Sequence, residues 1–189
     1  MVTMNNDKRV QKTLKEINQS FLEIAQVKKT DKITIKEICD KANICRSTFY
    51  EHYEDYPSFL KQLQNSLVEK YIATTKEYHF DTDTSATLNK LVDFILDNKD
   101  MLFLLFQDED RQNINKIIEY TKSKTLPVWM KESSLDYSQT EFVFTYFING
   151  TLAAIKFWYQ NQDSMDGDTF KKMLENTVKY GVYNYIYTV

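Results

Sequence analysis

Residues 34–53, TIKEICDKANICRSTFYEHY, constrain the fold of this chain more than any other stretch. Thr34 and Glu37 have the spacing of a capping box, in which each side chain accepts a hydrogen bond from the other residue's backbone N–H. Asn43 tolerates the left-handed conformation that ends a helix. Between them, four apolar residues have the i, i+3, i+4, i+7 spacing of one helical face: Ile35, Ile38, Cys39 and Ala42. The sequence therefore predicts a short helix that ends in a tight turn at Asn43-Ile44.

A second short helix is predicted to begin at Cys45, with Phe49 and Tyr53 as its apolar edge. The other side chains crowd hydrogen-bond donors into less than two turns: Arg46, Ser47, Thr48, Tyr50 and His52. In a helix–turn–helix motif the second helix enters the major groove of DNA and contacts bases and phosphates from its N-terminal end. The pattern predicts a DNA-binding surface. A small helical hairpin with an ordinary polar surface is the alternative interpretation.

This segment resembles the DNA-binding domain of the tetracycline-repressor (TetR) family of bacterial transcription regulators. The resemblance covers about the first sixty residues, and it is carried by Thr34, Ile38, Ala42, Arg46, Thr48, Phe49, Tyr50, His52 and Tyr53. The chain departs from the family pattern at three positions. Asn43 stands where the turn usually carries Gly, Cys45 stands where Ser is usual, and Tyr56 stands where Lys or Arg often begins the fourth helix. The last departure puts one phosphate contact in doubt.

The resemblance implies an all-α fold with two domains. Residues 1–56 would form the helix–turn–helix domain, and residues 57–189 a helical domain for effector binding and dimerisation. The protein would bind a palindromic double-stranded DNA operator as a homodimer, usually as a repressor. The residues expected at the DNA are Thr34, Lys36, Cys45, Arg46, Ser47, Thr48, Tyr50 and His52.

Glycine and proline are scarce, with three and two residues respectively in a chain of 189. Nucleotide-binding loops need clustered glycines, so that backbone N–H groups can approach phosphate, and none are clustered here. A shortage of turn residues favours an all-helical chain. The expected helices span about 7–28, 57–78, 85–97, 101–106, 110–124, 138–161 and 166–187, in addition to the helix–turn–helix. Asp100 is expected to cap the helix over residues 101–106. The helix that begins at about residue 110 is expected to be broken before Pro127.

The net charge of −3 is unevenly distributed. Residues 1–56 carry ten basic and nine acidic side chains, a net of +1, whereas the rest carries fourteen and eighteen, a net of −4. This weak basic character predicts modest non-specific affinity for DNA. The first thirty residues are polar and show no secretory signal, and the apolar tract 142–159 contains Asn149 and Lys156, which argue against a membrane span. These features predict a cytoplasmic protein with no membrane partner.

The expected helices over 138–161 and 166–187 are apolar on more than one side. A helix that is apolar nearly all round must be buried on two sides. A deep core within one subunit would satisfy that need, but we favour a subunit interface in which these helices from two copies form a four-helix bundle. The expected interface residues are Phe157, Trp158, Leu174, Val178 and Gly181.

Of the twenty-seven aromatic residues, twenty-two follow position 56. This density suits a helical domain that holds an apolar or aromatic effector, although it equally suits ordinary packing. The residues expected to line an effector pocket are Phe103, Tyr120, Trp129 and Phe147. The sequence indicates no cofactor and no catalytic constellation. Cys39 is expected in the core, and Cys39, Cys45 and His52 point to different faces and so do not predict a metal site.

The functional prediction is a DNA-binding transcriptional regulator and not an enzyme. The alternative is a TetR-like activator, or a protein-interaction module, that depends on a partner protein and has weak or no DNA binding of its own. The nearly neutral first domain and Tyr56 are the features that favour this alternative.

Overall fold

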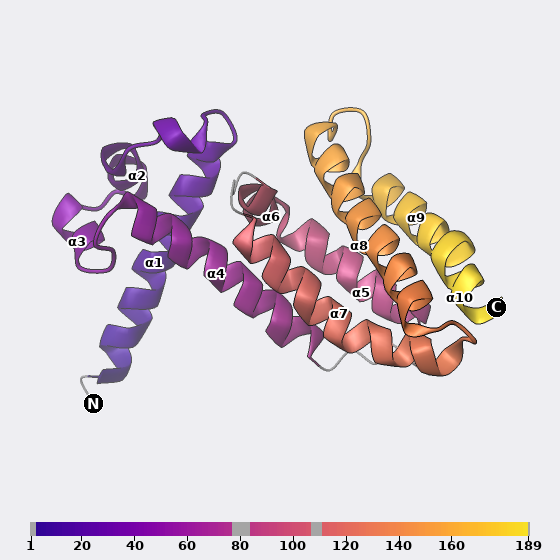
Figure 1. Cartoon of the computed structure of the whole chain (residues 1–189). Helices are drawn as coiled ribbons and strands as arrows, with labels where there is room; N and C mark the ends of the chain where they lie inside the picture. The colour runs from indigo at the N-terminus through magenta and orange to yellow at the C-terminus, as the bar shows by residue number, and fades with distance from the viewer. Residues whose placement is uncertain (1–2, 77–83, 107–110, 189) are drawn as a thin grey trace. The chain divides into compact units, whose positions relative to one another are not determined.

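A computed structural model describes residues 3–76, 84–106 and 111–188, and these residues form helices and no strand (Figure 1). The chain divides into two compact units, residues 1–66 and residues 67–189. The dividing point lies inside helix α4 (Tyr56–Thr75), ten residues after the boundary expected at 56/57. Because the described residues form helices and no strand, the expected all-helical fold class is confirmed.

The first unit contains α1 (Thr3–Ala25), the 3₁₀ turn η1 (Thr30–Lys32), α2 (Ile35–Ala42), α3 (Arg46–Tyr50) and the start of α4. Its core is an aromatic cluster in which Phe59 of α4 packs on Phe21 of α1, Phe49 of α3 and Tyr53, with ring centroids 5.1, 5.6 and 4.9 Å away. Cys39 is buried, as the apolar spacing predicts. The cluster fixes α3 on the other helices of the unit through Phe49.

Tyr56 has a structural role at the start of α4. Its hydroxyl donates a 2.6 Å hydrogen bond to the backbone carbonyl of Thr30, which ties α4 to η1. Burial, and secondarily the charge of Asp31, raise the pKa of Tyr56 to about 12. The side chain that replaces the family's usual basic residue is thus engaged inside its own unit.

We expect Tyr56→Phe to destabilise the first unit by about 1 kcal/mol, the usual net contribution of one hydrogen bond. The measurement is the free energy of unfolding in denaturant. Tyr50→Phe is the matched control, because that side chain is largely exposed and its loss of a hydroxyl should change stability by less than about 0.5 kcal/mol. Equal stability of the parent and the Tyr56→Phe variant would remove this role.

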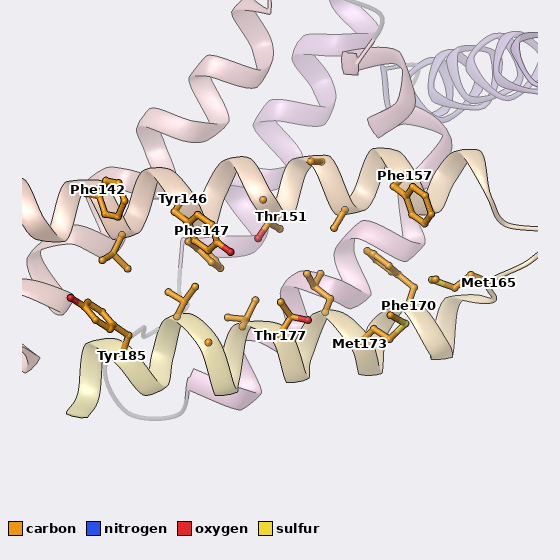
Figure 2. Close-up of a pocket in the computed structure, with 18 residues that line it drawn as sticks. Phe142, Tyr146, Phe147, Thr151, Phe157, Met165, Phe170, Met173, Thr177 and Tyr185 are labelled. Carbon is orange, nitrogen blue, oxygen red and sulfur yellow. The ribbon is translucent and has the colours of Figure 1, made fainter. Parts of the chain in front are cut away.

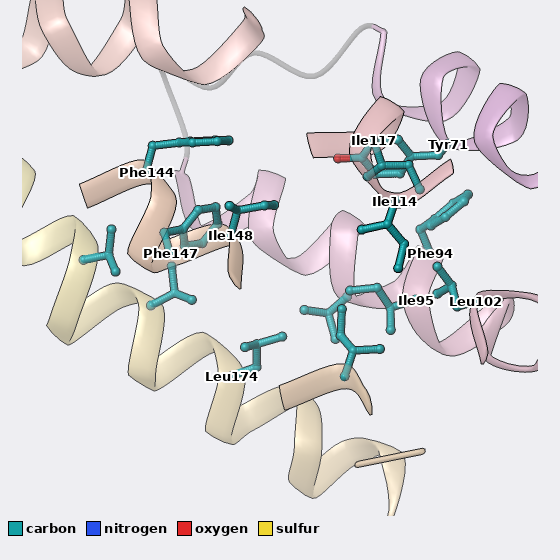
Figure 3. Close-up of a cluster of buried hydrophobic side chains, with 14 of the residues drawn as sticks. Tyr71, Phe94, Ile95, Leu102, Ile114, Ile117, Phe144, Phe147, Ile148 and Leu174 are labelled. Carbon is teal, nitrogen blue, oxygen red and sulfur yellow. The ribbon is translucent and has the colours of Figure 1, made fainter. Parts of the chain in front are cut away.

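The described residues of the second unit contain the end of α4 and seven further helical segments. These are α5 (Thr84–Asp97), α6 (Lys99–Phe106), α7 (Gln112–Glu132), α8 (Tyr137–Gln160), α9 (Gly167–Thr177), the π-helical segment η2 (Val178–Tyr183) and α10 (Asn184–Thr188). One continuous apolar core joins them, with Phe94, Ile117, Phe147 and Leu174 among its members (Figure 3). Helix α8 and the α9–η2–α10 segment lie side by side and antiparallel (Figure 1).

Helix α7 corrects one expectation. The sequence predicted a break before Pro127, but the helix continues through Pro127 to Glu132. A proline inside a helix costs about 3 kcal/mol through its missing N–H and its steric clash. Leu126 and Trp129 on either side of it are 5% and 1% exposed. Burial of these two side chains against the core, at about 1.5–3 kcal/mol for each large apolar group, outweighs that cost.

The C-terminal helix also differs from the single α-helix expected over 166–187, because η2 interrupts it with π geometry. The buried residues of this segment recur at every fourth position: Phe170, Leu174, Val178, Val182 and Ile186. In an α-helix of 3.6 residues per turn, each such step drifts by about 40°, so four steps would turn Ile186 about 160° away from Phe170. The wider π turns reduce this drift and keep all five residues on the core.

Other helix ends differ by a few residues. Helix α6 begins at Lys99, so Asp100 lies in its first turn and is not its cap. Asp136 and Gln139 form a capping box at α8 with the D-x-x-Q spacing, a signal that the sequence carried and the prediction overlooked. The ends expected at residues 78 and 110 lie outside the described residues.

Candidate nucleic-acid interface and effector site

The start of α2 is fixed by the predicted capping box. Thr34 Oγ1 accepts from the Glu37 backbone N–H at 3.3 Å, and Glu37 Oε2 accepts from the Thr34 N–H at 2.9 Å. Lys28 donates to Glu37 Oε1 at 2.6 Å. That ammonium group, followed by Thr34, lowers the pKa of Glu37 to about 2. The carboxylate therefore stays charged, and the cap stays formed, far into the acid range.

The turn between α2 and α3 has the conformation expected from Asn43, whose φ is 52° and ψ 46°. Its left-handed backbone ends α2 and allows the Ile44 N–H to bond the Cys39 carbonyl at 3.0 Å. Helix α3 then begins directly at Arg46. A sharp turn of this kind is what places two short helices at an angle in a helix–turn–helix.

Helix α3 is five residues long, with Phe49 buried in the aromatic cluster and its opposite face in solvent. His52 does not belong to the helix as expected, because α3 ends at Tyr50 and His52 lies in the following turn, where its N–H bonds the Phe49 carbonyl. The predicted DNA-contact residues of this unit are exposed or half-buried: Thr34, Lys36, Cys45, Arg46, Ser47, Thr48, Tyr50 and His52. We call the donor-bearing residues of α3 the α3 surface: Arg46, Ser47, Thr48 and Tyr50.

Cys45 lies at the N-cap of α3 and links two of the predicted DNA contacts. Its Sγ is 2.9 Å from Ser47 Oγ and 3.1 Å from Thr48 Oγ1. Hydrogen bonds from Ser47, and then from Thr48, lower the pKa of this exposed thiol to about 7. The sequence signal for this cluster is Cys in a position where Ser is usual, followed by two hydroxyl side chains.

An apolar groove of about 790 Å³ runs between α8 and the α9–η2–α10 segment (Figure 2). We call it the outer groove. Phe142, Tyr146 and Phe157 of α8 line it while remaining 74%, 71% and 58% exposed. Met173 and Tyr185 line the opposite side and are also exposed. Large apolar patches of this kind on a protein surface usually mark an interaction site.

The residues expected at a subunit interface fall into two groups. Phe157 and Gly181 lie on the outer groove and are exposed, and a Cβ added to Gly181 would meet no atom within 4 Å. The other three are buried in their own subunit, and their place at a subunit interface stays a prediction. Leu174 and Val178 form the floor of the groove, and Trp158 stacks on Phe170 with ring centroids 4.8 Å apart. The spacing of apolar residues did not identify Phe142, Tyr146 and Tyr185 as aromatic residues that remain exposed on the groove.

A smaller apolar space of about 80 Å³ lies inside the second unit, which we call the inner cavity. Side chains of α4 to α9 line it, and Figure 3 shows several of them, including Tyr71, Ile114, Ile117 and Phe147. Three hydroxyl-bearing side chains are among the described residues of its lining: Tyr71, Thr121 and Thr151. It offers an uncharged apolar environment.

Of the four residues expected to line an effector pocket, Phe147 lies on the walls of both the groove and the cavity. The other three pack elsewhere in the described part of the unit. Phe103 stacks on Tyr159 at 4.2 Å, Tyr120 meets the edge of Tyr71, and Trp129 is 1% exposed against Phe147 and Phe144. Aromatic content alone did not distinguish packing residues from lining residues.

The described residues contain neither a membrane-spanning helix nor a cluster of metal ligands. No helix within residues 3–76, 84–106 and 111–188 is long and apolar enough to cross a membrane. Over the same ranges, no three His, Cys, Asp or Glu residues gather in a way that could hold a metal ion.

Several solved structures have the same fold. A TetR transcriptional regulator from Streptococcus agalactiae 2603V aligns with a TM-score of 0.60 and 22% identity, over 93% of this chain and 98% of that one. The dihydroxyacetone kinase operon activator DhaS aligns with a TM-score of 0.63 and 16% identity, over 92% and 96%. FadR from Bacillus subtilis, in complex with stearoyl-CoA, aligns with a TM-score of 0.59 and 14% identity, over 86% and 95%. At these identities the likeness concerns the fold.

The sequence itself supplies the family. No curated protein is similar enough to the chain to be matched. Residues 82–180, more than half of the chain, match a TetR-type family model described as the transcriptional regulator C-terminal region. The chain therefore belongs to the TetR family of transcriptional regulators.

Proposed function

We propose that this regulator represses transcription by binding a palindromic operator as a homodimer, with α3 of each subunit in the major groove. The observation that carries the proposal is the α3 surface. Arg46, Ser47 and Tyr50 are exposed on a helix that begins directly after a sharp turn and is anchored from behind by Phe49. Donors at the start of a groove-entering helix can bond both base edges and phosphates.

The outer groove supports the dimer. Two copies related by a two-fold axis would bury the exposed aromatic residues of α8 and of the C-terminal segment against each other. Gly150 and Gly181 both lie on this groove, and a Cβ at either would meet no atom of the same subunit within 4 Å. Helices of a second copy could therefore approach the backbone closely at both points. The result would be a four-helix bundle with two helical segments from each subunit.

The inner cavity supports regulation by an apolar effector. An effector would change operator affinity only through a difference in its affinity for the DNA-bound and free conformations. The fold neighbour FadR, solved with stearoyl-CoA, suggests an effector with an apolar chain. The cavity of about 80 Å³ would accommodate only a short part of such a chain without movement of its walls.

A footprinting experiment on DNA that flanks the protein's own coding region tests the DNA-binding proposal. We expect protection of two half-sites about one helical turn apart, matching a two-fold symmetric dimer. Because the first 56 residues carry a net charge of only +1, the affinity should fall less steeply with salt than for strongly basic proteins. A dimer that protects no sequence on such DNA would contradict the proposal.

The thiol of Cys45 should make operator affinity depend on pH. Its pKa of about 7 gives a thiolate above neutrality, and a negative charge beside DNA phosphates opposes binding. The bound state should hold the proton to higher pH than the free state, so affinity should fall as pH rises through about 7. The measurement is the operator Kd between about pH 6 and about pH 9 for the parent and for Cys45→Ser, which lacks a group titrating there. A parent profile that matches the variant's would place Cys45 away from the phosphates.

A second candidate is an activator that works with a partner protein. Tyr56 favours it, because the hydroxyl bonded to Thr30 takes the place of a basic side chain often found at this position. The fold neighbour DhaS is itself named as an operon activator. A reporter gene placed behind the operator decides between the two. Deletion of the regulator should raise reporter expression if the protein is a repressor and lower it if the protein is an activator.

A further inference from the structure

The outer groove and the inner cavity share a wall. Three residues line both spaces: Phe147 and Thr151 of α8, and Leu174 of α9. Phe147 and Leu174 are 8% and 6% exposed, so both side chains are packed between the two spaces. Figure 2 shows Phe147 and Thr151 from the groove, and Figure 3 shows Phe147 and Leu174 among the core residues. Any movement of these side chains changes both spaces at once.

The inner cavity accepts only a particular chemistry. Among the residues that the structure describes, its lining contains no charged side chain, so a charged group inside it would lose its hydration without compensation. Thr121 Oγ1 donates to the Ile117 carbonyl at 2.7 Å, and Tyr71 then donates to Thr121 Oγ1, also at 2.7 Å. These two hydroxyls satisfy each other within the wall. A dry apolar cavity of about 150 Å³ holds benzene, so the inner cavity of about 80 Å³ fits an uncharged apolar group smaller than benzene.

We propose that an uncharged apolar group in the inner cavity regulates association of the two subunits at the outer groove, through Phe147, Thr151 and Leu174. The inference rests on the proposed dimer. Protein interiors are close-packed, so a group added to a cavity of about 80 Å³ moves its walls. On their other side, these three residues line the outer groove. Their displacement therefore alters the floor on which a second copy packs.

The C-terminal segment can absorb such a displacement in a discrete step. Leu174 is the last buried residue before η2, which begins at Val178 and also lines the groove through Gly181 and Val182. π turns are rare inside α-helices, and those that do occur are often at functional sites. Exchange of π for α turns in η2 would shift α9 along α8 without breaking the helix. Coupling between two sites requires an element of this kind with two arrangements.

A pair of matched variants tests the coupling. Ile117→Ala enlarges the inner cavity without substituting any groove residue, because Ile117 lines the cavity and not the groove. Leu126→Ala removes a side chain that is equally buried in the same core and lines neither space. Circular dichroism first establishes that both variants fold. The dimer dissociation constant is then measured by sedimentation for the parent and both variants, with and without benzene as the apolar probe.

We expect Ile117→Ala to weaken the dimer by about five-fold or more relative to Leu126→Ala, since Phe147 and Leu174 can relax into the enlarged cavity. Benzene should restore the affinity in Ile117→Ala and change it less than about two-fold in Leu126→Ala. By linkage, benzene should bind dimeric Ile117→Ala more tightly than its monomer by the same factor. Equal dimer constants for the two variants, with and without benzene, would overturn the coupling. A monomeric parent would instead overturn the proposed dimer.

Discussion

Phe157→Glu should convert the dimer into a folded monomer. The Phe157 side chain is 58% exposed in the isolated subunit, so a carboxylate there remains hydrated and the fold is preserved. In the proposed dimer the same carboxylate would be buried without a partner, at a cost of several kcal/mol per ion. Two-fold symmetry places the substitution in the interface twice. Sedimentation at about micromolar concentration, together with circular dichroism, measures both consequences.

Two further variants separate dissociation from unfolding. Met130→Glu introduces the same charge at an exposed apolar residue that does not line the outer groove, and it should leave the dimer intact. Val178→Glu places the charge at a residue that is 3% exposed on the groove floor, and it should unfold the second unit. A Phe157→Glu protein that sediments as a dimer would show that the subunits associate through another surface.

Loss of the dimer should also weaken operator binding. A dimer engages both half-sites in one event, because the second head binds from a high effective concentration once the first is bound. A monomer has only the contacts of one α3 surface, in a unit whose charge is close to neutral. Footprints of the Phe157→Glu variant should therefore disappear at concentrations that fully protect the operator with the Met130→Glu control.

Local signals in the sequence were sufficient for the helix–turn–helix. The capping box of Thr34 and Glu37 and the left-handed Asn43 depend on neighbours within a few residues, and both occur as predicted. Apolar spacing also identified the buried side of α2 and α3, including Cys39 and Phe49. These features depend on residue types and distances along the chain, which the sequence contains.

The second unit shows what the sequence leaves open. Helices α8 and α9 are apolar on two sides, and spacing alone does not say which side faces the subunit core. Trp158 and Val178 turned out to face inward, whereas Phe142 and Tyr146 face outward. The apolar residues that recur at every fourth position could have indicated the π segment. That inference requires knowing that all five of these residues pack against the same core. Helix α7 continues through Pro127 because of tertiary burial that no local rule contains.

The most specific prediction about DNA recognition concerns Arg46→Ala. Arg46 is exposed at the first position of α3, and no carboxylate forms an ion pair with it among the described residues. A guanidinium group can bond the O6 and N7 atoms of guanine together, which is worth about 1–3 kcal/mol of discrimination against another base. Removing it should relax the base preference by about 5- to 150-fold at one base pair of each half-site, symmetrically about the dyad.

Tyr50→Phe is the matched variant for a contact of the other kind. Its hydroxyl is expected to hold a phosphate, and phosphate contacts position the protein without carrying base information. Binding-site selection with the parent and both variants separates the two roles. Tyr50→Phe should weaken binding uniformly and keep the selected sequence, whereas Arg46→Ala should change that sequence at one symmetric pair of positions. If Arg46→Ala selects the parent's sequence with lower affinity, Arg46 contacts phosphate, and base recognition belongs to Ser47 and Thr48 at the same end of α3.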